Sequence, residues 1–85
     1  MKKIFKYQIR PTEEQEIMMP VGAEVNHVGL DPDGIPCIWA IVDPDARRES
    51  VIIQVIGTGH HVPDEGIFLG TYVKGVFVWH VFIQP

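Results

Sequence analysis

The chain has a single cysteine, Cys37, among its 85 residues. One cysteine excludes an intrachain disulfide and a zinc site built from cysteine pairs. Its neighbours are apolar, which predicts a small buried thiol. No apolar run reaches the roughly 18–20 residues that a membrane-spanning helix needs, so we expect no membrane partner. The first ten residues lack the apolar core of a signal peptide, so we expect a cytoplasmic protein.

Basic residues are also scarce. Seven Lys and Arg stand against eleven Asp and Glu, which gives a formal net charge of −4. Four of the basic residues lie near the start of the chain, and Arg47-Arg48 lies in an expected turn, where we interpret the pair as solvated. A nucleic-acid-binding domain needs a basic face. Nucleic acid is therefore not an expected partner.

Groups that could attack a substrate are few. Ser50 is the only serine, and it lies in an expected turn. A nucleophilic hydroxyl needs an adjacent base, and the local pairing is Thr58 with His60. Such a threonine more often braces a turn, and the carboxylates at 43 and 45 and at 64 and 65 also fit turn chemistry. The sequence predicts no catalytic residue and therefore a protein that is not an enzyme.

What the chain does contain is a series of short runs rich in Val, Ile, Phe, Tyr and Trp, separated by turn residues. This pattern is typical of strands. We expect strands at about residues 2–10, 16–19, 24–30, 35–43, 50–57, 67–73 and 76–84. Six or seven short, mainly antiparallel strands in one domain (residues 1–85) predict an all-β fold, either a small sandwich or a barrel-like sheet.

The turns between these runs have distinct chemistry. In Asp31-Pro32-Asp33-Gly34, proline presets the second position, aspartate bonds its own backbone and glycine takes positive φ, which predicts a hairpin. Lys74-Gly75 is expected to join the last two strands by a tight connection. Thr12-Glu13-Glu14-Gln15 has the form of a capping box, but Pro20 and Gly22 leave room for one helical turn at most.

Three runs are apolar on both faces: residues 37–42, residues 51–56 apart from Gln54, and residues 76–83 apart from His80. A strand exposed on one face should alternate apolar and polar residues. A closed barrel or a second subunit would cover the other face. We expect a homo-oligomer, with a dimer favoured, and Trp39 in the core. The alternative is a monomer whose two layers cover both faces.

Residues 57–66 place Gly, His, Pro and acids between two apolar runs. Loops held by a rigid β scaffold commonly carry binding sites. The ligand-binding candidates are Gly57, Thr58, Gly59, His60, His61, Asp64, Tyr72, Trp79 and His80. Backbone N–H groups at the two glycines would meet a phosphate, and an aromatic ring would stack on a base. The alternatives are a bulge or bend for the glycines and core packing for the aromatic residues and His80.

The histidines raise a metal alternative. Zinc needs three or four ligands, and His60 or His61 could converge with His80 and Asp64 if the loop folds over the last strand. The chain has neither a His-x-His pair nor a cysteine pair. We therefore expect no metal and no cofactor, and keep a small metal-dependent hydrolase as an alternative function.

Several segments spread over nearly the whole chain form a distinctive set: Ile4–Tyr7, Met19–Ala23, Pro36–Pro44, Gly57–His60, Gly70-Thr71 and Val78–Phe82. Together they resemble a family of short, functionally uncharacterised proteins of tailed bacteriophages and prophages. The resemblance implies a phage setting and a location in the host cytoplasm. By analogy it implies an accessory or anti-defence binding protein that occludes a host protein or sequesters a small nucleotide signal. A structural subunit of a virion or assembly is a further alternative.

Overall fold

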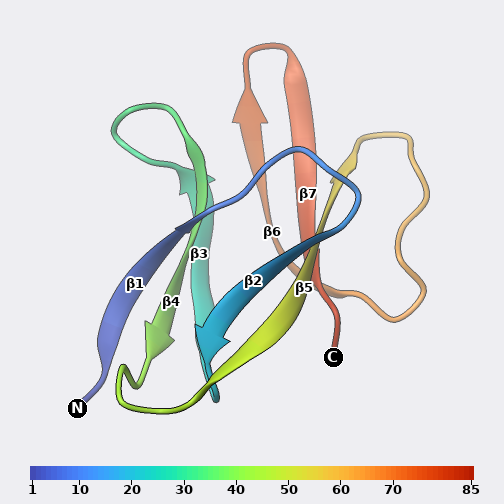
Figure 1. Ribbon diagram of the computed structural model, residues 1–85. Helices are drawn as coiled ribbons and strands as arrows, with labels where there is room; N and C mark the ends of the chain where they lie inside the picture. Colours follow the sequence, from blue (N-terminus) through green and yellow to red (C-terminus); the bar gives the residue numbers. More distant parts are fainter.

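The computed structural model describes residues 1–85 and contains seven strands and no helix (Figure 1). The strands are β1 (Lys3–Gln8), β2 (Gln15–Pro20), β3 (Glu24–Leu30), β4 (Pro36–Val42), β5 (Arg48–Gly57), β6 (Ile67–Lys74) and β7 (Phe77–Ile83). All strand pairs are antiparallel. The all-β prediction is confirmed. The chain has no helix of the length and apolar character needed to cross a bilayer.

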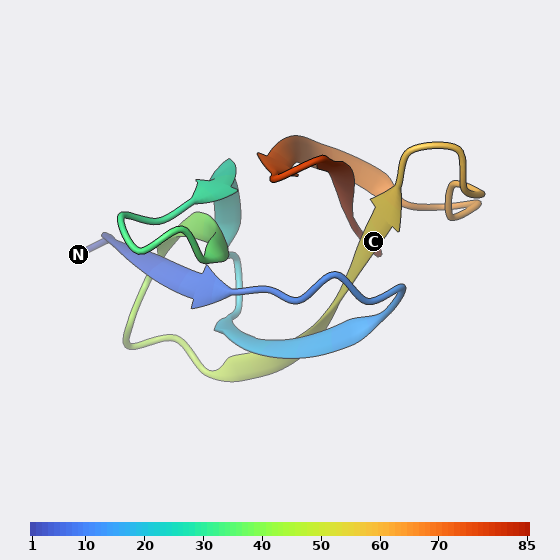
Figure 2. The ribbon, with the colours of Figure 1, turned by 90° about the horizontal axis from the view of Figure 1, so that it is seen from above.

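The strands form two sheets, one ordered β1-β4-β3 and the other β2-β5-β7-β6. Seen from above, the two sheets curve around a shared interior (Figure 2). They come closest where β3 faces β6, because a Cβ added at Gly70 would lie only 3.0 Å from Cβ of Val28. The arrangement thus matches the predicted sandwich or barrel-like sheet.

The core lies between the two sheets. Its members are all at most 7% exposed: Ile9, Met19, Val28, Ile38, Ile53, Val55, Tyr72 and Val81. Full burial of one such aliphatic side chain contributes about 1.5–3 kcal/mol. On each strand we call the side that faces this cluster inner and the opposite side outer.

Both predicted hairpins form. In the β3–β4 turn, Asp31 Oδ1 accepts the backbone N–H groups of Asp33 and Ile35, each at 2.9 Å, and Gly34 has a φ of +78°. In the β6–β7 hairpin the two turn residues are Gly75 and Val76, not Lys74 and Gly75, since Lys74 pairs with Phe77. With φ +61° at Gly75 and no positive φ at Val76, the turn has glycine first, as a type II′ turn requires.

The expected helical turn at Thr12–Gln15 is absent. Gln15 does reach back to the Thr12 hydroxyl, at 3.1 Å, but its side-chain amide also bonds both the N–H and the carbonyl of Arg10. The Gln15 side chain thereby pairs with the backbone of Arg10 as a neighbouring strand would, and it closes the loop between β1 and β2. The contact between Gln15 and Thr12 that the capping-box pattern predicts does form, but it stabilises a loop and not a helix.

The expectation that Trp39 lies in the core is wrong. Ile38 and Ala40 point inward and are fully buried, so Trp39 between them points outward, where it is half-buried beside the His27 ring. Cys37, on the same outer side, is 1% exposed, which confirms the predicted buried thiol. Burial raises the pKa of this thiol.

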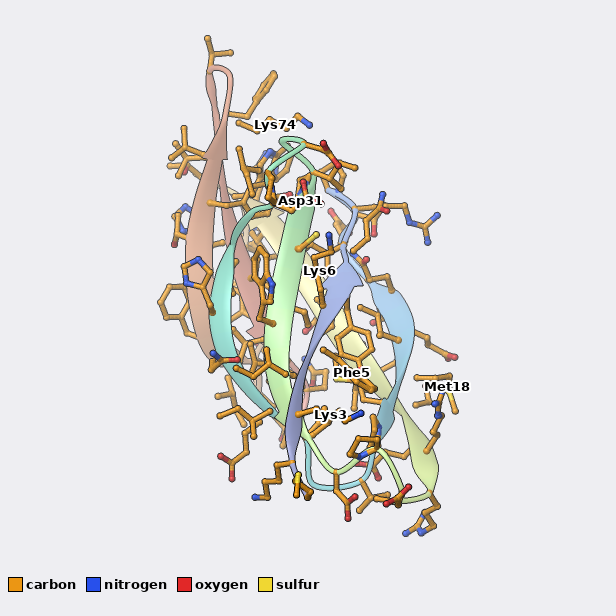
Figure 3. The ribbon with its side chains drawn as sticks, turned by 90° about the vertical axis from the view of Figure 1, so that its left-hand side faces the viewer. Lys3, Phe5, Lys6, Met18, Asp31 and Lys74 are labelled. Atoms are coloured by element: carbon orange, nitrogen blue, oxygen red, sulfur yellow. The ribbon has the colours of Figure 1, made fainter.

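A buried carboxylate lies beside Cys37. The Asp31 side chain is 4% exposed and accepts the Lys6 ammonium at 3.0 Å; Figure 3 shows the two residues near one end of β1. The N–H of Ile35, followed by the Lys6 ammonium, lowers the pKa of Asp31. The side-chain hydrogen bond from Lys6 to Asp31 in turn raises the pKa of Lys6. The carboxylate thus links β1 to the β3–β4 turn.

The outer face of β5 and β7 is covered in part by the chain itself. Ile56 and Phe82 lie on this face, yet each is only 8% exposed. The loop of residues 58–66 runs beside them, because a Cβ added at Gly66 would lie 3.2 Å from Cβ of Phe82. A loop, rather than a helix, therefore covers part of the second apolar face of these strands. The β6–β7 hairpin projects beyond this cover (Figure 1).

Candidate functional site

The nine candidate residues fall on two sides of the β2-β5-β7-β6 sheet. Trp79 and His80 are neighbours on β7, so their side chains point to opposite faces. Trp79 packs against the core from the inner side, whereas His80 faces outward. The structure therefore divides the predicted site into two recesses, both beside the loop that follows β5.

The first, which we call the Trp79 recess, has a volume of about 620 Å³. Its walls contain five of the candidates: Gly57, His60, His61, Asp64 and Trp79. Gly57 is the residue that shapes it. A Cβ added there would lie 3.3 Å both from Cδ2 of His60 and from a ring carbon of Trp79, so the missing side chain lets both rings approach this strand end.

The second, the His80 recess, has a volume of about 270 Å³ and is mainly apolar. Its walls contain the candidates Gly57, Thr58, Gly59, His60 and His80, together with Ile56, Val62, Phe68 and Phe82. Both nitrogens of His80 are occupied: Nε2 lies 2.9 Å from Thr58 Oγ1, and Nδ1 lies 3.0 Å from Thr71 Oγ1. The predicted Thr58–His60 pairing is replaced by Thr58–His80.

Tyr72 belongs to neither recess, so the structure does not place this candidate with the others. Its side chain is 3% exposed within the core, and its hydroxyl has no hydrogen-bond partner. Burial raises its pKa. The β6–β7 register pairs Tyr72 with Trp79 on the inner side, and a bulge farther from the turn, between Phe68 and Gly70, places Phe68 opposite Phe82 on the outer side. The sequence gives no direct sign of such a bulge.

Thr71 is the polar residue that sequence reasoning missed. The β6–β7 register pairs it with His80. The assumed turn at Lys74-Gly75 would have placed Val78 opposite Thr71, because shifting a two-residue turn by one position moves every cross-strand partner by two. A turn with glycine in its first position would have identified the pair.

Charge in the loop region is negative. The Trp79 recess is lined by Glu13 and Asp64, and an adjoining recess of about 450 Å³ by Glu14, Asp64 and Glu65. No lysine or arginine lines either one. Like charges repel, so this arrangement disfavours a phosphate group there. It leaves room for an uncharged or cationic planar ligand beside Trp79.

The residues of the metal alternative do not converge. The structure contains no group of three or more His, Cys, Asp or Glu side chains placed to hold one metal ion. Both ring nitrogens of His80 lie within hydrogen-bond distance of threonine hydroxyls. The geometry gives the metal-dependent hydrolase no ligand set.

An apolar strip dominates the outer side of the β6–β7 hairpin and the loop beside it. We define it as Val62, Phe68, Val73, Val76 and Val78, which are between 37% and 89% exposed. Seven of the eleven exposed large apolar residues of the chain lie between positions 62 and 78. β6 and β7 together contain one charged residue, Lys74, whose ammonium donates to the carbonyl of Gly34 at 2.9 Å.

Comparison with known proteins gives a family but no activity. A family model described as a domain of unknown function (DUF7352) matches residues 1–85. Neither the curated proteins nor the solved structures contain a significant match to the chain.

Proposed function

We propose that this chain, which belongs to the DUF7352 family, is a non-catalytic binding protein that docks its apolar strip on a partner protein. The observation that carries the proposal is the strip itself. Valines and a phenylalanine that would be core residues elsewhere are exposed together on one hairpin and its adjoining loop. Contiguous exposed apolar patches of this kind mark interaction sites.

The energetics favour docking. Each valine or phenylalanine of the strip that a partner covers fully would contribute roughly 1.5–3 kcal/mol of burial free energy. The strip contains no carboxylate, ammonium or guanidinium that would have to be desolvated. The polar pair that lies between Phe68 and Val73 on the same face, Thr71 and His80, already satisfies its polar side-chain atoms within the molecule. The strip can therefore be covered at little electrostatic cost.

The polar cluster supports binding rather than catalysis. Thr58 and His80 lie within hydrogen-bond distance, as a nucleophile and its base would. In a nucleophilic triad, however, a carboxylate stabilises the imidazolium that forms during reaction. Here the second His80 nitrogen faces a neutral hydroxyl, that of Thr71. We interpret the cluster as a structural contact that holds the loop of residues 58–66 on the sheet.

The resemblance to small phage and prophage proteins adds a biological setting to the proposal. In that setting the partner would be a host protein that the chain occludes in the host cytoplasm, as an accessory or anti-defence factor. A structural subunit of a virion would also use an apolar strip. Quantitative mass spectrometry of purified particles distinguishes the two, because a virion subunit is present in them at fixed stoichiometry.

A second candidate is binding of a small planar ligand in the Trp79 recess. The specific observation is the approach of His60 and Trp79 at Gly57, which leaves ring surface beside a cavity of about 620 Å³. The carboxylates of Glu13 and Asp64 favour an uncharged or cationic ligand over a nucleotide phosphate. Gly57→Leu would fill the recess, and a bound small molecule should then be lost in native mass spectrometry.

The test of the main proposal is native mass spectrometry and quantitative proteomics of the full chain purified from cells that produce it. The double variant Val73→Ser, Val78→Ser alters one exposed cross-strand pair of the strip. A matched control, Ile4→Ser with Met18→Ser, alters two residues exposed on other strands. We expect the strip variant alone to lose the bound protein. A partner retained equally by both variants, or no bound protein at all, would contradict the proposal.

A further inference from the structure

We infer that the occupant of the apolar strip is a second copy of this chain, so that two strips pack face to face in a two-fold symmetric dimer. This inference rests on the proposed function, because it assumes that the strip is the binding surface. It adds the identity of the partner and the arrangement of the contact.

Charge distribution favours a second copy as the occupant. Each copy has a formal net charge of −4, so two copies repel wherever their carboxylates approach. None of the eleven acidic residues lies in β6 or β7. The outer face of the β1-β4-β3 sheet is also partly apolar, but it contains Lys6 and Glu24. The four strip residues of the β6–β7 hairpin therefore form a face without carboxylates, and only Val62 lies in the loop that contains Asp64 and Glu65.

The outer face of the hairpin also has the same chemistry at both ends. The cross-strand rows on the outer face of the β6–β7 hairpin are Phe68 with Phe82, Thr71 with His80, and Val73 with Val78. Both ends are apolar, and the middle row is polar but internally bonded. A two-fold axis through the middle row would set Val73 and Val78 of one copy over the Phe68 end of the other. Two-fold contacts require such a surface, in which each end fits the other.

The size of the strip sets the expected strength. Phe68 is 56% exposed and Val76 is 89% exposed, so the five residues together offer a patch on the order of a few hundred Å². Stable interfaces bury about 800 Å² per partner. The strip is smaller, so we expect a reversible dimer with a dissociation constant in roughly the micromolar range.

Sedimentation velocity of the full chain between about 1 and 100 µM, a range that brackets that dissociation constant, tests the inference. Val73→Glu puts a carboxylate on the strip, and Ile4→Glu makes the same change at a similarly exposed site on β1. We expect the wild type and Ile4→Glu to shift from monomer to dimer with concentration. For Val73→Glu we expect the dissociation constant to rise about 100-fold or more, because each dimer would contain two unpaired carboxylates in an apolar contact.

Circular dichroism shows whether each variant is folded. If Val73→Glu is unfolded, Phe68→Ser replaces it, because this change removes the ring at the other end of the strip without adding charge. It should weaken the dimer at least 10-fold. A wild type that stays monomeric at 100 µM, or a folded strip variant that dimerises like the wild type, would overturn the inference.

The outcome also separates this inference from the proposed function. If the wild type is monomeric, and a different protein bound in cells is lost with Val73→Glu but kept with Ile4→Glu, the second copy is excluded and the proposed function stands. If neither a second copy nor another protein binds through the strip, both fail.

Discussion

Nε2 of His80 lies 2.9 Å from the hydroxyl oxygen of Thr58, although the two residues are 22 positions apart. Thr58 opens the loop that follows β5, and His80 lies in the middle of β7. The contact therefore ties the start of the loop to β7, one of the two inner strands of the four-stranded sheet. With Thr71 on the other ring nitrogen, one imidazole joins two strands and a loop.

Replacing this imidazole should loosen the loop. His80→Phe keeps an aromatic ring but loses both hydrogen bonds, and each is worth about 0.5–1.5 kcal/mol. We expect the free energy of unfolding to fall by about 1–2 kcal/mol, and hydrogen exchange of residues 58–66 to accelerate. His61→Ala, at an exposed position without such bonds, is the control and should change stability by less than about 0.5 kcal/mol. Unchanged hydrogen exchange of residues 58–66 in His80→Phe would contradict the proposal that His80 holds this loop on the sheet.

Asp31 should make stability depend on acid pH. The Ile35 N–H and then Lys6 lower its pKa in the folded state. A lowered folded pKa means that the carboxylate stabilises the fold above the unfolded-state pKa of about 3.9, and that this stability disappears as the pH falls through the folded pKa. Asp31→Asn should therefore be less stable than wild type at pH 7, and the difference should shrink below about pH 4.

Urea denaturation at a series of pH values measures this difference. Asp33→Asn is the matched control, because it is a neighbouring exposed aspartate whose carboxylate makes no hydrogen bond in the turn. It should not reproduce the pH dependence of Asp31→Asn. A constant gap between wild type and Asp31→Asn down to pH 2 would show that the charge of Asp31 is irrelevant to stability.

Removing the buried hydroxyl of Tyr72 should not destabilise the fold. This hydroxyl is sealed from solvent without a hydrogen-bond partner, and such burial costs about 1–3 kcal/mol. Tyr72→Phe keeps the ring in the core and removes that cost, so we expect thermal unfolding at an equal or higher temperature. Tyr7→Phe is the comparison, because Tyr7 is only half-buried. Clear destabilisation by Tyr72→Phe alone would mean that the hydroxyl has a partner.

Two glycines should respond differently to the same added methyl group. In Gly70→Ala the new Cβ would lie 3.0 Å from Cβ and Cγ2 of Val28 on the opposite sheet, so the sheets must move apart. Overpacking of this kind costs about 1–3 kcal/mol. In Gly57→Ala the neighbours are His60 and Trp79 ring atoms at 3.3 Å, and His60 lies in an exposed loop that can yield. Urea denaturation should show Gly70→Ala as the more damaging change.

The fold class could be predicted because strand signals are local. Val- and Ile-rich runs and the Asp31–Gly34 turn are visible in the sequence, and both appear in the structure. The orientation of single side chains could not be predicted as well. Trp39 faces outward because it alternates with the inward-facing Ile38 and Ala40, and Tyr72 faces inward because the β6–β7 register pairs it with Trp79. A one-residue error at the β6–β7 turn was enough to hide the Thr71–His80 pair.

The candidate site was predicted in part. The loop after β5 does border two recesses, and all the candidates except Tyr72 line one or the other. Their division between two faces depends on the alternation along β7, which places Trp79 and His80 on opposite sides. The apolar strip could not be located from composition, because the cover that the 58–66 loop gives Phe82 is a tertiary contact.

The strand order also constrains how the molecule reaches its native state. β7 lies between β5 and β6, so the larger sheet is interrupted until the last strand is in place. Only β3–β4 and β6–β7 can pair as local hairpins, and the remaining ladders must close long loops first. Chains dominated by such distant pairings fold slowly, in milliseconds to seconds for small β proteins. During folding, apolar strands such as β5 would therefore keep an unpaired edge until β7 is in place. The yield of native protein would then depend on how quickly β7 inserts between β5 and β6.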